Sequence, residues 1–236
     1  MNIMMKALMS VVALMISTVA WPAVLVQESP VSVQQTNVIA EGNFSSGRTG
    51  GPLLKPWICS KNTEKARVTL ETPTGRPEAE RWVRLADDSD KENANLRQSF
   101  APVTSGRFQV RLISNKGGGR LSFNLGTGAA SSPEERAVQL SIDSDGSLVV
   151  RAEHKHKTPS QIKPGAVYLV RCDFEPVKDG KALRILAELV EESTQRQSRL
   201  ETEVETELAI TTVRVTSTKT DTGVDYYVTD LSLTGR

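Results

Sequence analysis

The feature that most constrains the fold of this chain is a repeated alternation of apolar and polar residues with a period of two. In residues 107–112, RFQVRL, every second side chain is apolar, and the same pattern recurs in residues 120–125, 138–143 and 183–189. Successive side chains of a β-strand point to opposite faces, so one face of each run is apolar and the other is polar. This alternation is typical of antiparallel sheets that bury one face and expose the other.

Short turn signals separate these apolar and polar runs. They are NKGGG at 115–119, DSDG at 143–146, KPG at 163–165, VKDG at 177–180 and TDTG at 220–223. Many short strands with Gly, Asp and Pro turns favour two packed antiparallel sheets over alternating strands and helices. The sequence therefore predicts an all-β fold, a two-sheet antiparallel β-sandwich.

The segment 198–209, SRLETEVETELA, fits two periods. Leu200, Val204 and Leu208 have helical i, i+4 spacing, but the apolar and threonine positions also alternate strictly with glutamates. The threonines favour a strand and the glutamates favour a helix. We favour a strand that pairs with a neighbour, and a short surface helix is the alternative.

The N-terminal residues predict export. Lys6 precedes an apolar run from Ala7 to Ala20. The small residues Thr18 and Ala20 have the spacing that is usual before a signal-peptide cleavage site. We expect a signal peptide over residues 1–20, a polar leader over 21–36 and a single domain over 37–236. Because the apolar run is shorter than the roughly 20 residues that span a bilayer, we expect no membrane insertion. The predicted location is secreted or periplasmic.

Charge and cysteine content limit the function further. The formal net charge is +1 at pH 7, so no global field points to nucleic acid or to an anionic membrane. Cys59 and Cys172 are the two cysteines. An exported protein permits a disulfide between them, and two buried free thiols are the alternative.

Three stretches carry a resemblance to a known group of folds. They are NVIAEGNFSSGRTGGP at 37–52, RWVRLADDSDKENANLRQSFAP at 81–102 and GVDYYVTDLSLTG at 223–235. Together they resemble the opening strand, a strand–loop–strand passage and the closing strand of concanavalin A-like lectin/glucanase jelly rolls, which include laminin G-like domains and laminarinases. The resemblance implies a jelly roll over nearly the whole mature chain. That superfamily includes lectins, hydrolases, lyases and inert modules, so the fold alone assigns no function.

The resemblance also implies a structural calcium between the first and last strands. Glu41, with Asn43 nearby, and Asp230 occupy the matching positions, and their oxygens suit Ca²⁺. Glu at position 41 departs from the more usual Asp. No organic cofactor is expected.

Three sets of residues are candidates for catalysis or zinc binding. Glu201, Glu203 and Glu205 alternate as catalytic carboxylates of retaining glucanases do, but the central Asp of that motif is missing. Tyr168, Tyr226 and Tyr227 are of the type that lyases use as a base, but no lyase motif surrounds them. His154 and His156 form half of a zinc site at most, and the register of SLVVRAEHKHK places them on the core side at the rim of the sandwich.

The polar faces of the predicted strands are the better candidate for binding. Guanidinium groups make bidentate contacts to carboxylate or sulfate, and amides bond hydroxyls, so a face rich in both suits an acidic or polar glycan. The candidate ligand-binding residues are Arg111, Arg120, Asn124, Arg151, Glu153 and Lys155. An ordinary solvated sheet with cross-strand charge pairs is the alternative.

The sequence therefore favours an exported module that binds a polysaccharide or cell-surface glycan without catalysis. A uronate polysaccharide lyase and a structural module with no sugar site are the alternatives. The identity of the glycan, the strand order and the oligomeric state do not follow from the sequence.

Overall fold

The computed structural model describes residues 36–117, 119–152, 154–218 and 223–235. The predicted signal peptide, the leader up to residue 35 and Glu153 lie outside these residues, so the predicted domain boundaries stay predictions. In the described part of the chain, no helix is long and apolar enough to cross a membrane.

The first sheet contains eight antiparallel strands. Their order is β13 (Arg196–Glu205), β12 (Ala182–Glu191), β11 (Val167–Val177), β6 (Gly106–Ser114), β15 (Val224–Gly235), β4 (Trp82–Asp87) and β3 (Ala66–Glu71), and β1 (Thr36–Asn37) pairs with β15. The first and last strands of the domain are thus neighbours, as the resemblance implies.

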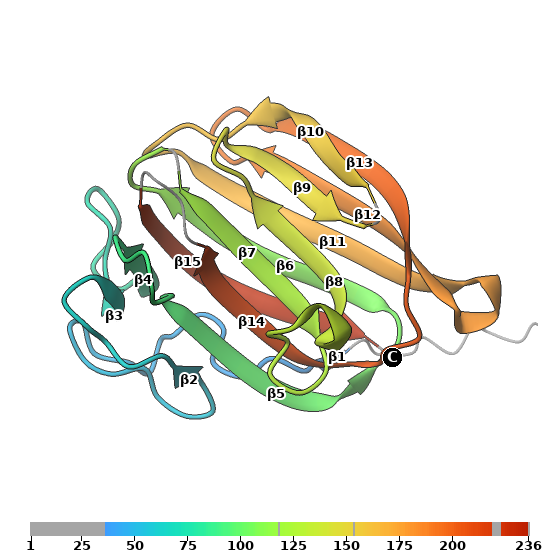
Figure 1. The fold of residues 1–236 in the computed structure, drawn as a ribbon. Helices are drawn as coiled ribbons and strands as arrows, with labels where there is room; N and C mark the ends of the chain where they lie inside the picture. Colours follow the sequence, from blue (N-terminus) through green and yellow to red (C-terminus); the bar gives the residue numbers. More distant parts are fainter. Residues whose placement is uncertain (1–35, 118, 153, 219–222, 236) are drawn as a thin grey trace, which may run out of the picture. The chain divides into compact units, whose positions relative to one another are not determined.

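The second sheet contains seven antiparallel strands. Their order is β10 (Lys155–Gln161), β9 (Ser147–Arg151), β8 (Arg136–Ile142), β7 (Arg120–Gly126), β14 (Ile210–Thr218), β5 (Asn95–Val103) and β2 (Ile58–Cys59). The two short 3₁₀ turns are η1 (Pro133–Glu135) and η2 (Lys178–Gly180). Figure 1 shows the two sheets as stacked layers, and the predicted all-β sandwich is confirmed.

The core lies between the two sheets and contains the apolar half of each alternating run. Phe108 of β6 and Phe123 of β7 meet across this interface with their ring centroids 5.9 Å apart, and both are fully buried. Because the apolar residues face inward, their polar neighbours form the outer faces of the sheets. The site must therefore be sought on these outer faces or at the sheet edges.

The ambiguous segment 198–209 is mainly a strand. Residues up to Glu205 belong to β13, which pairs with β12 along its length, and Leu200 and Val204 pack against the core. The strand prediction is confirmed, because one side of the segment completes the core at the edge of the first sheet.

The stretch with both histidines is not one continuous strand. β9 ends at Arg151 and the chain turns back, so that β10 pairs Lys155 with Arg151 and His156 with Val150. His154 and His156 are exposed. The prediction that they extend the core side of one strand is wrong, because His154 lies in the bend just before β10 and His156 lies in β10, the edge strand of the second sheet.

The two cysteines are free thiols on different sheets. Cys172 is buried in β11 of the first sheet, and Cys59 is partly buried in β2 of the second. Of the two alternatives that the sequence leaves open, the structure has the free thiols. Burial raises the pKa of Cys59 to about 11 and raises the pKa of Cys172 further.

Candidate functional site

The candidate site is a polar hollow of about 380 Å³ on the second sheet, which we call the arginine groove. Strands β7, β8, β9 and β14 provide most of its surface, and the loop after β7 adds Ser131. Its lining residues are Asn93, Arg120, Ser122, Asn124, Ser131, Arg136, Gln139, Arg151, Arg214, Thr216, Ser217 and Thr218. The groove is thus lined by guanidinium, amide and hydroxyl groups.

Strand register builds the centre of the groove. Arg214 of β14 lies opposite Arg97 of β5 on one side and opposite Asn124 of β7 on the other, and Asn124 lies opposite Gln139 of β8. Directly opposite residues of an antiparallel pair point to the same face. One row across four strands, on the face away from the core, therefore contains Arg214, Asn124 and Gln139 of the groove and continues to Arg97 beside it.

A β-bulge brings Arg136 to the groove. Leu125 pairs with Val138, but the next residue, Gly126, pairs with Arg136, so β8 contains one extra residue at Ala137. A bulge of this kind changes the face to which the neighbouring side chain points. By simple alternation with Val138, Arg136 would face the core, and instead it lines the groove.

At one end of the groove, Asp143 neutralises two arginines. Its Oδ1 accepts hydrogen bonds from Nε of Arg120 at 2.9 Å, from Nη2 of Arg151 at 2.8 Å and from Oγ of Ser141 at 3.0 Å. The Asp143 side chain is 15% exposed. Oδ1 of this carboxylate therefore accepts three hydrogen bonds and holds both guanidinium groups in place.

At the other end of the groove, the arginines lack such a partner. Nε of Arg136 and Nε of Arg214 are buried and have no hydrogen-bond partner among the described residues, and the same is true of Oδ1 of Asn124. Burial lowers the pKa of Arg136, and burial together with the positive charges of Arg97 and Arg136 lowers the pKa of Arg214. This end therefore holds an excess of positive charge and unused hydrogen-bonding atoms.

The structure brings together three of the predicted ligand-binding residues. Arg120, Asn124 and Arg151 line the arginine groove. Lys155 lies opposite Arg151 on the edge strand β10 and is exposed, beside the groove rather than in it. Glu153 lies outside the described residues.

Arg111 is predicted from the sequence to lie with these residues, but the structure places it in β6 of the first sheet. There its guanidinium group bonds Glu192 at 2.6 and 3.1 Å and Asp230 at 3.1 Å, and it lies 5.2 Å from the ring centroid of Trp82. Arg111 is thus fully engaged on a different sheet from Arg151. Alternation predicts its outward direction correctly but cannot assign it to a sheet.

The predicted calcium ligands lie in the same hollow as Arg111. Glu41 and Asp230 both line it, next to the contact between Leu231 N–H and the carbonyl of Gly42. However, Asp230 is paired with Arg111, and the carboxylate of Glu41 accepts a hydrogen bond from the hydroxyl of Ser46. In the described ranges, no three His, Cys, Asp or Glu residues are grouped so that they could hold a metal ion. A guanidinium group beside the carboxylate does not fit a Ca²⁺ site, and calcium stays an untested expectation.

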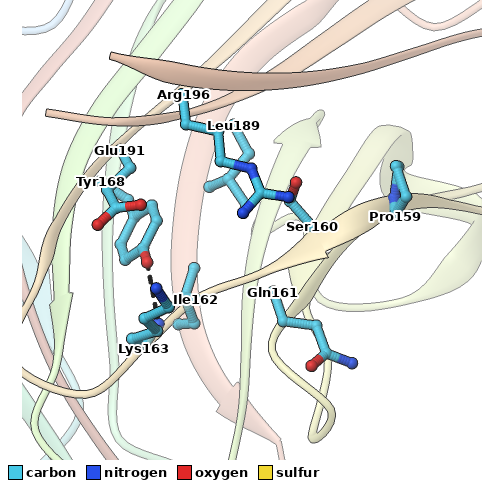
Figure 2. A pocket seen from close by; sticks show the side chains of 9 residues that line it. All are labelled: Pro159, Ser160, Gln161, Ile162, Lys163, Tyr168, Leu189, Glu191 and Arg196. Atoms are coloured by element: carbon cyan, nitrogen blue, oxygen red, sulfur yellow. Dashed lines mark hydrogen bonds between the residues drawn. The ribbon is translucent and has the colours of Figure 1, made fainter. Parts of the chain in front are cut away.

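A second hollow, of about 250 Å³, lies where the end of β10 approaches β11 and β12 (Figure 2). Tyr168 faces it, and the Tyr168 hydroxyl oxygen accepts a hydrogen bond from the backbone N–H of Lys163 at 3.0 Å. Burial raises the pKa of Tyr168, which makes its phenolate less available as a base near neutral pH. Arg196 and Glu191 line the same hollow (Figure 2), which therefore contains both a positive and a negative side chain.

The other catalytic candidates are engaged in structural contacts. Tyr226 is buried, donates a hydrogen bond to the carbonyl of Gly119, and has its pKa raised to about 12 by burial. Glu203 forms an ion pair with Lys178 at 2.7 Å on the edge strand β13. Neither lies in the arginine groove.

Arg97 and Arg136 are not among the residues predicted from the sequence. Arg97 lies between the buried residues Leu96 and Gln98, so alternation is a signal that indicates its outward direction. No sequence signal marks the bulge that turns Arg136 outward.

Comparisons with known proteins show the fold and no closer relationship. No family model matches the chain, and no curated protein matches it. Among solved structures, a sialidase matches over 85% of this chain with a TM-score of 0.60 and 12% identity, and the chain spans 19% of the length of that protein. Lectin II from Ulex europaeus matches with a TM-score of 0.46 and 12% identity, over 77% of this chain and 95% of that one. The catalytic domain of a glycoside hydrolase family 131 protein from Coprinopsis cinerea matches with a TM-score of 0.46 and 10% identity, over 84% and 94%.

At these identities the likeness establishes architecture alone. The chain is a two-sheet antiparallel β-sandwich whose fold is similar to that of the matching part of the sialidase.

Proposed function

We propose that this protein is an exported carbohydrate-binding module that holds an acidic or polar glycan in the arginine groove, without cleaving it. The observation that carries the proposal is the composition of the groove. Guanidinium, amide and hydroxyl side chains from four adjacent strands share one hollow, and several of their buried polar atoms have no partner among the described residues.

The chemistry of these groups suits a glycan. Asn124, Gln139 and the hydroxyl groups of Ser122 and Thr216 can bond sugar hydroxyls, and the arginines can bond an acidic substituent. A buried polar atom without a partner costs roughly 1–3 kcal/mol, so a ligand that supplies partners binds with that cost relieved.

Binding is favoured over catalysis because the groove offers no catalytic residue of the usual kind. Its lining residues, all in the described part of the chain, include no Tyr, His, Asp or Glu. A lyase needs a base near the uronate, and a glycosidase needs two carboxyl groups across the scissile bond. Asp143, the adjacent carboxylate, is held by Arg120 and Arg151.

A panel of acidic and neutral polysaccharides tests the proposal. Binding is measured by affinity electrophoresis and calorimetry, and release of unsaturated products is followed by ultraviolet absorbance. We expect binding without product, and Arg151→Ala is expected to weaken it. Arg107→Ala, which removes the same charge from the first sheet, is the matched control and should bind as the wild type does.

Three results would contradict the proposal. Formation of unsaturated product would support the lyase alternative. Failure to bind every member of the panel would support a structural module. Equal loss of affinity in Arg151→Ala and Arg107→Ala would place binding outside the arginine groove.

A further inference from the structure

The inner strands of the two sheets differ in how their outward-facing arginines are neutralised. On the inner strands β6 and β12 of the first sheet, Arg107, Arg111 and Arg184 form ion pairs, with Asp173, Glu192 and Glu175 respectively. In the arginine groove, Arg120 and Arg151 share Asp143. In the described part of the chain, Arg97, Arg136 and Arg214 form no ion pair, and we call these three residues the anion pole.

Arg214 lies close enough to the other two members of the anion pole to be repelled by both. Arg97 and Arg214 are directly opposite across β5 and β14, and the charges of Arg97 and Arg136 both act on Arg214. Glu135 is the acidic residue nearest in the chain to Arg136, but its carboxylate is taken up by the Ser131 and Ser132 backbone N–H groups and by the Ser131 hydroxyl. Glu135 therefore forms no ion pair with the pole and offsets only part of its positive charge, through space, at Arg136 and Arg214.

Unused hydrogen-bonding atoms point to what the pole binds. Nε of Arg136 and Nε of Arg214 are donors without a partner among the described residues. Oδ1 of Asn124 is an acceptor that also has no partner among the described residues. Asn124 lies opposite Arg214 and is 1% exposed. Two cationic donors beside a neutral acceptor match an anionic group with a hydroxyl next to it.

We infer that the anion pole holds a carboxylate or sulfate group of the glycan, while Asn124 accepts a hydrogen bond from a hydroxyl of the same sugar. This inference rests on the proposed function and deepens it. It requires the glycan to carry a negative charge, and it places that charge at the anion pole. The opposite end of the groove, where Asp143 offsets Arg120 and Arg151, is expected to contact uncharged parts of the glycan.

The physical basis is that an anion relieves two costs at once. It supplies partners for buried donors, and it reduces the repulsion of Arg214 by Arg97 and Arg136, none of which can lose its proton near neutral pH. Guanidinium groups also bind carboxylate and sulfate in a bidentate manner, which positions the sugar as well as attracting it.

The experiment compares charged and uncharged forms of the same backbone. Calorimetry measures binding of oligogalacturonate and of its carboxyl-reduced form, and of dextran sulfate and dextran. We expect the wild type to bind at least one acidic form about ten-fold more tightly than its neutral counterpart. Arg97→Gln and Arg214→Gln should lose most of this preference, and the control Arg107→Gln should keep it. Tighter binding of oligogalacturonate than of its carboxyl-reduced form identifies carboxylate as the anion. Tighter binding of dextran sulfate than of dextran identifies sulfate.

Folding of the variants is checked by circular dichroism and by melting. Because Arg214 is repelled by its neighbours, Arg214→Gln is expected to melt at or above the wild-type temperature. As a second measurement, sodium sulfate should raise the melting temperature of the wild type more than that of Arg97→Gln.

The outcomes separate this inference from the proposed function. Equal binding of acidic and neutral forms by the wild type, or an unchanged preference in both Arg97→Gln and Arg214→Gln, overturns the anion pole and leaves glycan binding in place. Failure of the wild type to bind any of the four glycans overturns both.

Discussion

Asp143→Asn should lower stability and raise affinity for an acidic glycan at the same time. The substitution preserves the shape of the side chain and removes the charge that Arg120 and Arg151 share. Their contacts to Asp143 Oδ1 are 2.9 and 2.8 Å long, and the Asp143, Arg120 and Arg151 side chains are 15%, 28% and 19% exposed. All three groups are thus shielded enough for the lost charge to be felt.

The magnitude follows from these contacts. A hydrogen bond to a charged group contributes about 1.5–3 kcal/mol, and removing one partner of a buried ion pair costs about 3–5 kcal/mol. Because Asn keeps one acceptor oxygen and the pair is only partly buried, we expect a loss of about 2–3 kcal/mol in the free energy of unfolding. For a domain of this size, this corresponds to a melting temperature lower by roughly 4–12 °C.

Asp173→Asn is the matched control. Asp173 also bonds an arginine, Arg107, at 2.5 and 2.7 Å, but it lies on the first sheet and the two side chains are 34% and 48% exposed. Exposed ion pairs contribute about 0–1 kcal/mol, so this variant should lose at most that amount. Urea unfolding followed by circular dichroism measures both variants. A loss in Asp143→Asn no greater than in Asp173→Asn, or unchanged affinity for oligogalacturonate, would refute the reasoning.

Three further predictions concern other parts of the domain. Hydrogen bonds from the Ser131 backbone N–H, the Ser131 hydroxyl and the Ser132 backbone N–H lower the pKa of Glu135 to about 2. The stability that this group contributes is therefore present above its unfolded-state pKa of about 4.3 and is lost as the pH falls toward 2, and an NMR titration midpoint above 4 would contradict this. Phe108→Ala should cost about 3–5 kcal/mol in a denaturant titration, because the ring fills the space between the sheets against Phe123; a loss below about 1 kcal/mol would be inconsistent with that packing. A thiol-reactive dye should label both Cys59 and Cys172 in guanidinium chloride and neither rapidly in the native protein, since burial raises the pKa of both; absence of labelling in denaturant would instead indicate a disulfide.

Local alternation explains why part of the groove could be predicted. The direction of a side chain in a strand depends on its position relative to its neighbours, so Arg120 and Asn124 face outward because Leu121, Phe123 and Leu125 face the core. The same rule gives the outward direction of Arg111 and Arg151. Alternation cannot tell which outward-facing residues are neighbours, so Arg111 is predicted to lie beside arginines that belong to another sheet.

What the sequence by itself determined is the fold class and the division of each strand into an apolar and a polar side, because both follow from a period of two within short segments. Tertiary structure alone decided which polar sides form one surface. Arg97, Asn124 and Arg214 become neighbours only through the pairing of β5, β14 and β7, which are distant in the chain. The bulge that turns Arg136 outward likewise exists only in the pairing of β7 with β8. Strand register depends on contacts between remote segments and on the closing of the core, and no local pattern contains that information.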